Sequence, residues 1–459
     1  MEGSEIGKKK AIWRDERAIA LLMAAMLTTM ANATISPALP GLQRLFAEDP
    51  NAAILTRLLV PAPSLCVALC APFAGLATDR FGRRRLLLGG VMLFVIAGSC
   101  GLFLPDLPTI FVSRLVLGVA VALIMTAQTA LIGDYFSGAA RSALTGLQIS
   151  ARNFGGLLFI SLAAWAALVS PRLPFAIYCL PIVVLPLMWK AIVDTTRPSP
   201  KQAAGTINGA DGSPTWRLLF MALVFLQALT NMLFFIVPTQ LPFFLDAYGQ
   251  NSAVMTGSSL AVLMLTGGSF ALLYPRVRRG LGHVGVFAFG YAAMASGFFL
   301  LTVSAAAAKV FAGAALIGAG YALVSPTFVA LVLNLVPAER RGLAGGILTA
   351  SVFIGQFCSP LLSTPAISGA GYEGLFRGTA VLLATMALTA VAVGGVHLAH
   401  RHHGRRAAGT LAARVSPRPQ FEGTASAADY RSASPAQHGG VDRRVPEQKL
   451  AFLETRNGD

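Results

Sequence analysis

Two arginines lie inside long apolar segments of the chain, where their side chains could bind a ligand. Arg114 opens the stretch RLVLG, and Arg152 stands next to Asn153 in a later segment. A guanidinium keeps its charge and carries five hydrogen-bond donors, so it suits an anion or several acceptors. Because a charge in an apolar layer is costly, each arginine is a candidate substrate or coupling residue. The alternatives are an Arg114 side chain that reaches the membrane surface and a structural role for Arg152 beside polar groups at helix ends.

Other polar side chains in apolar segments are weaker candidates, because each alone more often bonds a neighbouring helix than a ligand. Asp134 and Asp246, at the ends of such segments, are candidates for proton coupling. The middle of every apolar segment lacks Asp and Glu, so we expect a neutral or anionic substrate. The polar candidates are Asn32, Gln128, Gln148, Asn153, Gln227, Asn231, Gln240 and Gln356.

The elements that must position these residues are twelve apolar runs. The chain of 459 residues is 55% hydrophobic and only 12% charged, whereas about a quarter of the residues of a soluble domain are charged. Each run can cross a hydrocarbon layer about 30 Å thick as a helix, and none alternates as a barrel strand does. We therefore predict an all-α polytopic membrane protein with spans at about 18–40, 54–77, 86–105, 108–133, 141–169, 173–193, 216–246, 251–275, 284–304, 307–336, 341–369 and 374–398.

The basic residues orient these spans. Before residue 399, Lys and Arg number 19 on one side of the predicted layer and five on the other. Positive loops stay in the cytoplasm, so both termini are predicted to be cytoplasmic. Topology thus explains the net charge of +16 better than nucleic-acid binding does. The predicted parts are a cytoplasmic N-terminus (1–17), an N-terminal half (18–193), a linker (194–215), a C-terminal half (216–398) and a disordered basic tail (399–459).

Several residues recur at a constant displacement of 200 positions. The matched pairs are Gly82 and Gly282, Gly118 and Gly318, Arg141 and Arg341, Gly146 and Gly346, and Gly155 and Gly355. Such a repeat indicates duplication and predicts two pseudo-symmetric six-helix halves, the arrangement that an alternating-access transporter uses. Arg114 has Ala314 as its counterpart, and Arg152 has Val352, so this polarity belongs to one half only.

A charged loop separates the second and third predicted spans, where residues 75–85 read GLATDRFGRRR. The positive-inside rule accounts for the arginines but not for Asp79, because acidic side chains contribute little to topology. An Asp at a helix end can instead pair with an Arg or meet the positive N-terminus of another helix. The loop resembles the Gly-x-x-x-Asp-Arg-x-Gly-Arg-Arg/Lys signature of the major facilitator superfamily, and the span count and the repeat agree.

This resemblance covers about residues 15–398 and implies that family's twelve-helix fold and secondary transport. It implies that Asp79 braces a cytoplasmic contact between the halves, near the start of the eleventh span, and stabilises the outward-open state. The second copy of the loop, YPRVRRGLGH at 274–283, lacks the Asp, so we expect a one-sided latch. The residues expected in this latch are Gly75, Asp79, Arg80, Gly82, Arg83, Arg84, Arg141 and Arg341.

Two further segments bear on the resemblance. RLVLG at 114–118 is similar to the family's intramembrane Arg-x-x-x-Gly motif. The fifth predicted span has the glycines, but not the Pro, of the Gly-Pro element that many proton-coupled drug exporters of the family carry. The short loops and the stretch ANATISPALP resemble the efflux group more than the sugar-uptake group.

Metal, cofactor and enzyme chemistry are not expected. All five cysteines fall in apolar runs, which is typical of small buried residues. Four histidines near the end of the last span lie among arginines, which disfavours a metal ion. No apolar segment holds a set of nucleophile and base, and the tail is too short and polar for the output domain of a sensor. These histidines are His397, His400, His402 and His403.

The sequence therefore favours a monomeric secondary transporter of a bacterial inner membrane. We expect proton-driven efflux of a drug-like compound or of a secreted metabolite such as a siderophore. The alternative is an uptake symporter for a small organic anion, which the two internal arginines would also suit. The expected partners are the small-molecule substrate, protons and the lipid bilayer.

Overall fold

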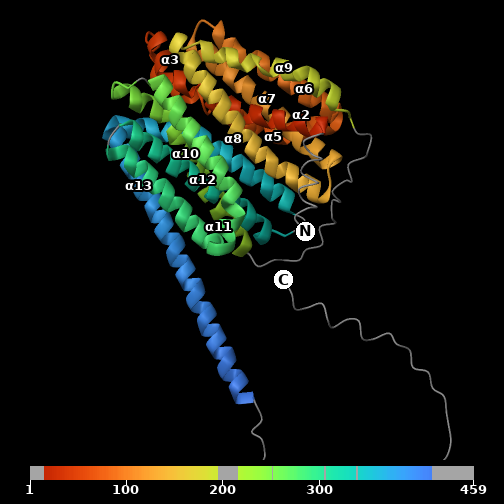
Figure 1. Cartoon of the computed structure of the whole chain (residues 1–459), viewed down its shortest axis with the longest axis vertical. Helices are drawn as coiled ribbons and strands as arrows, with labels where there is room; N and C mark the ends of the chain where they lie inside the picture. Colours follow the sequence, from red (N-terminus) through yellow and green to blue (C-terminus); the bar gives the residue numbers. More distant parts are fainter. Residues whose placement is uncertain (1–14, 195–214, 251, 304–305, 338–339, 416–459) are drawn as a thin grey trace, which may run out of the picture. The chain divides into compact units, whose positions relative to one another are not determined.

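The computed structural model describes residues 15–194, 215–250, 252–303, 306–337 and 340–415, and helices make up most of these ranges (Figure 1). Residues 1–400 form one compact unit and residues 401–459 form a second. The helices are α2 (Glu16–Ala33), η1 (Ser36–Ala38), α3 (Leu39–Leu45), α4 (Ala52–Leu59), α5 (Ala62–Phe81), α6 (Arg83–Ser99), η2 (Cys100–Leu102), α7 (Leu107–Tyr135), α8 (Gly138–Val169), η3 (Leu173–Cys179), α9 (Pro181–Ala191), α10 (Thr215–Ala247), α11 (Ser252–Val303), α12 (Ala307–Leu335) and α13 (Arg341–Val415).

The described helices supply the expected number of membrane crossings. Nine are long and apolar enough to cross a membrane, and the bent pair of α4 and α5 makes a tenth crossing. α11 and α13 each contain one glycine with a non-helical backbone, Gly282 and Gly371, which divides the helix into two limbs. Counting both limbs of each of these two helices raises the ten crossings to twelve.

Three reversals of the chain occur at glycines with a positive φ. Gly82 joins α5 to α6 with φ of 87°, and Gly282 and Gly371 have φ of 67° and 70°. A side chain would make this backbone region costly, so glycine is the residue that allows the reversal. Gly82 and Gly282 occupy the same loop of the two halves, as the repeat predicts.

The repeat is also present in the packing. Gly118 of α7 approaches α5 so closely that a Cβ there would meet the carbonyl oxygen of Pro63. Gly318 of α12 approaches α11 in the same way, against the carbonyl oxygen of Leu263. Pro63 and Leu263 are themselves 200 positions apart, so the prediction of two pseudo-symmetric halves is confirmed down to single contacts. A second matched set is Gly90 against Ala120 and Gly290 against Gly320.

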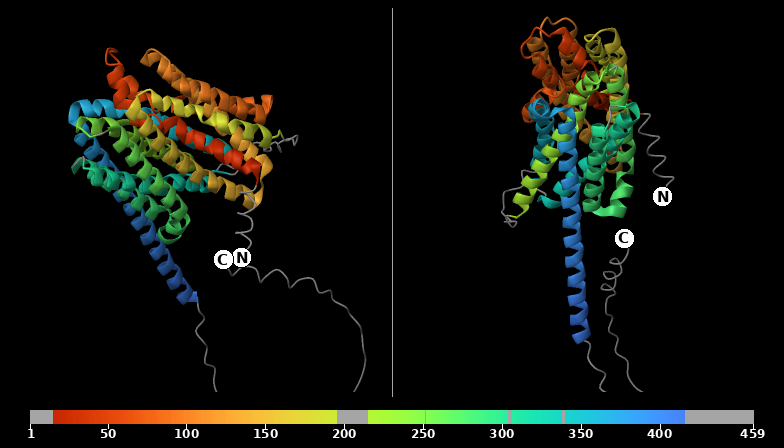
Figure 2. Two further views of the ribbon diagram at one scale, coloured as in Figure 1. Left: turned by 45° about the horizontal axis from the view of Figure 1, so that its top comes forward. Right: turned by 90° about the vertical axis from the view of Figure 1, so that its left-hand side faces the viewer.

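The crossings run side by side between two ends of the bundle (Figure 2). We name each end after one residue that lies there. The Gly82 end holds the turns at Gly82 and Gly282 and the breaks after α7 and α12. The Asp246 end holds α3, the end of α10 and the turn at Gly371.

Two clusters of buried apolar side chains form the core. One lies wholly within residues 18–192 and fills the N-terminal half. The other fills the C-terminal half and extends into the N-terminal half through Ile35, Leu39, Leu59 and Phe175, among others. These four residues belong to segments close to the Asp246 end, so the two halves share a core there.

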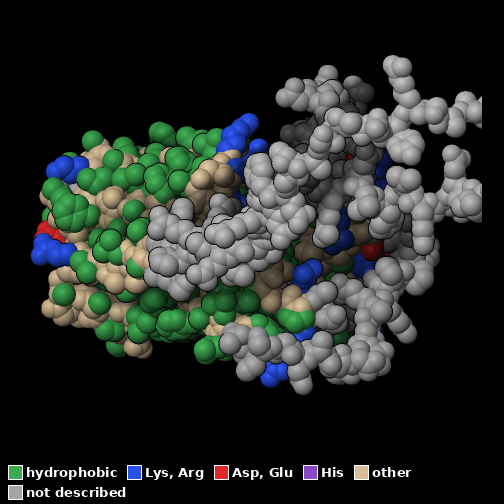
Figure 3. Space-filling view, turned by 90° about the horizontal axis from the view of Figure 1, so that it is seen from below, with side chains coloured by type: hydrophobic (Ala, Val, Ile, Leu, Met, Phe, Trp, Pro, Cys, Tyr) green, Lys and Arg blue, Asp and Glu red, His purple; other side chains and the backbone are tan. Residues whose placement is uncertain are grey.

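The outer surface is apolar where a membrane would surround it. Large hydrophobic side chains such as Phe73, Trp165 and Phe225 are about 70% exposed, whereas a soluble monomer rarely exposes a wide apolar patch. Figure 3 shows hydrophobic side chains over the middle of the visible face, with Lys and Arg toward its two sides. This surface confirms a multi-span membrane protein.

The last helix runs beyond the predicted span. α13 continues to Val415, so helix reaches into residues 399–415 of the segment predicted as a disordered tail. The stretch RRAAGTLAARV at 405–415 is rich in Ala and Arg, which favour helix, and this accounts for the difference. Residues 416–459 lie outside the described residues.

Candidate functional site

Arg114 lies on α7 and is fully buried, so it does not reach the membrane surface. Its Nε donates to the carbonyl oxygen of Leu59 at 3.3 Å, and its Nη2 donates to the Tyr178 hydroxyl at 3.0 Å and to the carbonyl oxygen of Ala31. Leu59 ends α4 and Ala31 lies in the last turn of α2, where carbonyls lack helical partners and favour a cation. Arg114 therefore holds two helix ends together, while its Nη1 has no partner among the described residues.

Asn32, Ser64 and Gln356 meet where the two halves touch. Asn32 Nδ2 donates to Ser64 Oγ and to Gln356 Oε1, both at 3.3 Å, and Ser64 Oγ donates to Gln356 Oε1 at 2.7 Å. Asn32 and Ser64 belong to the N-terminal half and Gln356 to the other. We call these three residues the inter-half cluster. Because Asn32 follows Ala31, the helix end that Arg114 holds is the one that carries Asn32.

The sequence predicted Asn32 and Gln356 as cavity residues but not Ser64. A serine in an apolar helix usually bonds its own backbone, so its sequence position carries no signal. Here the Ser64 side chain is fully buried and points instead to the other half.

A second group of polar and aromatic side chains lies within the C-terminal half. The Asn231 side chain donates to the carbonyl oxygen of Gln227 at 2.9 Å and accepts from the Tyr321 hydroxyl at 2.8 Å. The Tyr321 ring stacks on Phe234 with centroids 3.9 Å apart. Gln227 Oε1 is buried and has no partner among the described residues. This group links α10 to α12 and keeps one acceptor unused.

Gln128 and Gln148 differ in their surroundings. Gln128 is buried on α7, and its Nε2 donates to the carbonyl oxygen of Leu21 at 2.5 Å. Gln128 thus ties α7 to α2 within the N-terminal half. Gln148 is half-buried on α8.

Arg152 and Asn153 lie near the middle of α8, which packs against α11 of the other half. The Arg152 Nε atom is buried, and the described residues offer it no hydrogen-bond partner. The Asn153 side chain donates to the carbonyl oxygen of Ile149 in its own helix. Asn153 also packs closely on α11, because a Cβ added at Gly268 would lie 3.3 Å from the Cβ of Asn153. Gly268 therefore allows the two halves to approach closely at this point.

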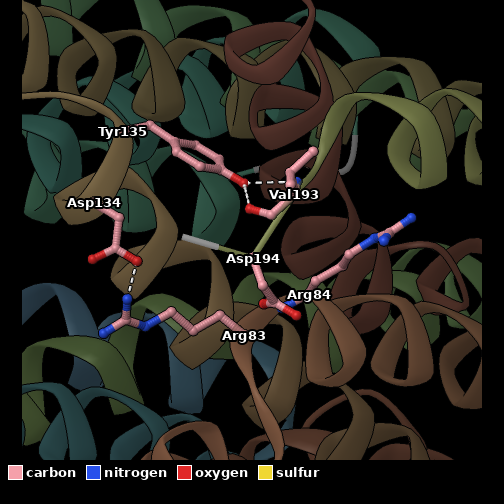
Figure 4. Close-up of polar contacts among 6 residues, drawn as sticks. All are labelled: Arg83, Arg84, Asp134, Tyr135, Val193 and Asp194. Atoms are coloured by element: carbon pink, nitrogen blue, oxygen red, sulfur yellow. Dashed lines mark hydrogen bonds and ion pairs between the residues drawn. The ribbon is translucent and has the colours of Figure 1, made fainter. Parts of the chain in front are cut away.

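The arginines of the charged loop contact their own half at the Gly82 end (Figure 4). Arg83 forms a partly buried ion pair with Asp134, at the end of α7. The backbone N of Arg84 donates to Asp194 Oδ1 at 2.9 Å, beside Gly82, and its side chain donates to the carbonyl oxygen of Trp189 at 2.8 Å. Asp194 was not predicted as a site residue, since it lies where the sequence indicates only the start of a linker.

Within the described part of the chain, the other members of the predicted latch form no hydrogen bond or ion pair between the halves. Arg341 donates to the carbonyl oxygen of Val336 at 3.3 Å, within the C-terminal half. Arg141 is exposed near Gly133, and Arg80 is exposed beside Phe81. A Cβ at Gly75 would meet open space. The side chain of Asp79 lies outside the described residues.

Polar contacts join the two halves at the Asp246 end. Both carboxylate oxygens of Asp246 accept from Arg44 at 2.8 Å, in an exposed ion pair. Arg57 is buried, and its Nε donates to Gln240 Oε1 at 3.1 Å while its guanidinium lies 4.0 Å from the centre of the Phe243 ring. From the sequence, Arg44 and Arg57 were only counted as loop charges, because their partners lie about 200 residues away. Ser36 adds a bond to the carbonyl oxygen of Pro238.

A tyrosine just beyond α10 belongs to the same end. The Tyr248 hydroxyl donates to Glu373 Oε1 at 2.9 Å, across the turn at Gly371. This hydrogen bond to a carboxylate raises the pKa of Tyr248 above its usual value. The same hydrogen bond ties the end of α10 to α13 within one half.

The structure also contains a cavity of about 250 Å³ between α10 and the two limbs of α13. Its walls are mainly apolar, and its buried polar members are Ser359, Ser363 and Thr379. It lies within the C-terminal half, apart from Arg114 and Arg152 on the N-terminal helices. Gln356, one turn before Ser359 on α13, connects this region to the inter-half cluster.

The described part of the chain brings together no group of three metal-ligating side chains. All five cysteines are free thiols. The side chains of His397, His400, His402 and His403 lie outside the described residues.

Comparison with known proteins places the chain in a family. The sequence model of the Major Facilitator Superfamily matches residues 21–308, which is more than half of the chain. Multidrug resistance protein 1 of Bacillus subtilis is 23% identical over 303 residues, 64% of this chain and 76% of that protein. The class C tetracycline resistance protein of Escherichia coli is 27% identical over 374 residues, 78% of this chain and 91% of that protein.

A solved structure of the same fold is that of a D-xylose-proton symporter. It superposes with a TM-score of 0.65 over 81% of this chain and 96% of its own, at 18% identity. The chain therefore belongs to the Major Facilitator Superfamily: it is a multi-pass membrane protein that transports small molecules and is not an enzyme.

Proposed function

We propose that this transporter exports a small organic molecule, neutral or anionic, in exchange for protons. The cargo would be a drug-like compound or a secreted metabolite such as a siderophore. The observation that carries the proposal is the inter-half cluster, in which uncharged hydrogen-bonding side chains of both halves meet at Gln356 Oε1. Similarity to a multidrug resistance protein and a tetracycline resistance protein supports the direction of transport.

The inter-half cluster suits a binding site that two moving halves share. Asn32 and Ser64 offer donors to whatever acceptor faces them, and Gln356 offers both a donor and an acceptor. When the halves separate around a substrate, its polar groups replace these mutual hydrogen bonds, so the site loses little hydrogen bonding. Gln227 Oε1 and Arg152 Nε, which have no partner among the described residues, are further candidates for substrate contact.

The proposed orientation puts the Gly82 end in the cytoplasm, because this end carries the excess of Lys and Arg. The structure then corresponds to a state closed toward the outside by the contacts of Arg44, Arg57 and Ser36. In the outward-open state, the latch around Asp79 would take over at the cytoplasmic side. Arg83 would set the loop for this contact through its ion pair with Asp134.

Proton coupling is proposed for Asp134 or Asp246. Each forms an ion pair with an arginine, Arg83 or Arg44. The pair of Arg44 and Asp246 joins the two halves, so a movement that opens the Asp246 end must break it.

The alternative is an uptake symporter for a small organic anion. Buried Arg114 and the unsatisfied Nε of Arg152 favour it, because both would attract a carboxylate. The direction of transport separates the two functions.

The test uses inverted membrane vesicles that contain the protein, in which respiration acidifies the interior. An exporter would accumulate a fluorescent, uncharged or anionic drug inside these vesicles, and a protonophore would abolish the accumulation. Ser64→Ala removes the hydrogen bonds of Ser64 to Asn32 and to Gln356. A loss of about 1 kcal/mol should lower the rate about five-fold. Ser269→Ala is the matched control, because Ser269 is exposed and bonds its own helix at Leu265.

Equal rates in the two serine variants would overturn the assignment of the inter-half cluster. Proton-driven loss of an organic anion from the same vesicles would favour the uptake symporter. Preferential block by lipophilic cations would contradict a neutral or anionic cargo.

A further inference from the structure

The cavity between α10 and α13 has the form of a small binding pocket. Met232 and Ile236 of α10 line one wall, and both limbs of α13 line the others. Its volume of about 250 Å³ is near the lower limit of small-molecule sites, which begin at about 300 Å³. It could hold one compact molecule rather than a large drug.

One polar group in this cavity lacks a partner. Ser359 is only 1% exposed, and its Oγ makes no hydrogen bond with any described residue. Thr379 bonds its own helix at Leu375, and Ser363 accepts from Gln240. A buried hydroxyl without a partner is costly, so a ligand that supplies one hydrogen-bonding group would gain affinity at Ser359.

The cavity opens toward the membrane. Leu362 is 60% exposed and Leu382 is 39% exposed, and both line it. Ala366 and Gly378 are also exposed and also line the cavity. Because the side chain of Ala366 is small and Gly378 has none, the space between the two limbs of α13 stays open. A molecule dissolved in the bilayer can therefore enter sideways without crossing a polar surface.

Ser359 lies between two side chains that are linked to the N-terminal half by hydrogen bonds. Gln356, three residues earlier on α13, bonds the inter-half cluster, and Ser363, four residues later, bonds Gln240 at 2.8 Å. Gln240 in turn accepts from Arg57 of the other half. About one helical turn separates Ser359 from either contact, so a ligand there would lie beside both.

We propose that this cavity binds a small, mainly apolar molecule that carries one hydroxyl or carbonyl group and enters from the bilayer. A phospholipid acyl chain fits the apolar walls but would leave Ser359 unpaired, so the amphipathic molecule is the better occupant. The site is distinct from the inter-half cluster, and its occupancy does not depend on the direction of transport.

Photolabelling of the full-length protein in phospholipid nanodiscs tests the proposal. The probe is an eight-carbon alcohol with a diazirine on its chain, compared with the same probe without the hydroxyl. The alcohol should label peptides that contain the residues of the cavity, and excess 1-octanol should prevent the labelling. Loss of one hydrogen bond predicts about five-fold weaker labelling by the alkane probe, and the same loss in Ser359→Ala.

Ala366→Phe fills the opening and should abolish the labelling, whereas Ala292→Phe, on an exposed part of α11 outside the cavity, should leave it unchanged. Labelling spread over all membrane-facing helices would overturn the proposal. Equal labelling by alcohol and alkane, or a phospholipid found in the cavity, would also overturn it, in favour of an acyl chain. Each readout is binding, so failure of the proposed export would leave the result interpretable.

Discussion

The Arg114 side chain caps the C-terminal ends of two helices. α2 and α4 end inside the bundle, where no water reaches the free carbonyls. A single planar guanidinium reaches Ala31, Leu59 and Tyr178 at once, which the point charge of a lysine does not. Any role of Arg114 in transport is therefore combined with a structural role.

Replacement of this arginine should be costly even by lysine. Arg114→Lys leaves buried carbonyls unpaired, and we expect a loss of about 3 kcal/mol. Tyr178→Phe removes a hydroxyl that accepts from Arg114 and donates to the carbonyl oxygens of Met30 and Ala31, and should cost about 2 kcal/mol. Thermal unfolding in detergent measures both. The double variant should lose less than the sum, because the two side chains share a bond; strict additivity would contradict the shared role.

At the scale of helices, close approach explains why the matched glycines recur. Gly118 and Gly318 let the backbones of neighbouring crossings touch, whereas Gly146 and Gly346 face open space. The repeat therefore contains both packing glycines and glycines that the packing does not require.

Substitution should separate these two kinds of glycine. Gly118→Ala forces a methyl group against Pro63 and should cost about 1–3 kcal/mol. Gly146→Ala, the matched control, meets nothing within 4 Å and should be neutral or slightly stabilising. Thermal unfolding compares the two variants, and equal destabilisation would argue against the packing explanation.

The sequence predicted the helices and the repeat because both depend on local properties. Hydropathy determines which segments can cross a membrane, and glycine determines where the chain can reverse at Gly82 and Gly282. The partners across the halves were not predictable. Whether Arg57 meets Gln240, or Ser64 meets Gln356, depends on how two six-helix units dock, and no local pattern encodes that.

Two residues of the inter-half cluster were already candidates from the sequence, for a physical reason. Asn32 and Gln356 were predicted as cavity residues because an amide in an apolar span needs a partner inside the protein. The sequence did not indicate Arg57 as a contact residue, because an arginine near a helix end is also expected for membrane topology alone. The latch around Asp79 stays a prediction, because the side chain of this residue lies outside the described part of the chain.

At the scale of the whole molecule, the contacts of Arg57 should stabilise closure of the Asp246 end. Spin labels on Asn51→Cys and Gln250→Cys, in a chain without its native cysteines, report the distance between the halves there. Arg57→Met removes hydrogen bonds of a charged group, so the open population should rise about ten-fold. Arg172→Met is the control, because Arg172 bonds Leu102 and Leu104 within its own half.

An unchanged distance distribution in Arg57→Met would show that the buried arginine does not help to close this end. An equal change in the Arg172→Met control would point to general loosening of the surface instead.

The contacts of Gly118 with Pro63 and of Gly318 with Leu263 also indicate how the chain evolved. A contact preserved in both halves was present in the six-helix ancestor before its gene doubled. Ala314 is the counterpart of Arg114 in the repeat, so this charge was gained by one copy or lost by the other after the doubling. The scaffold is thus the common inheritance of the two halves, and the chemistry at Arg114 is where they diverged.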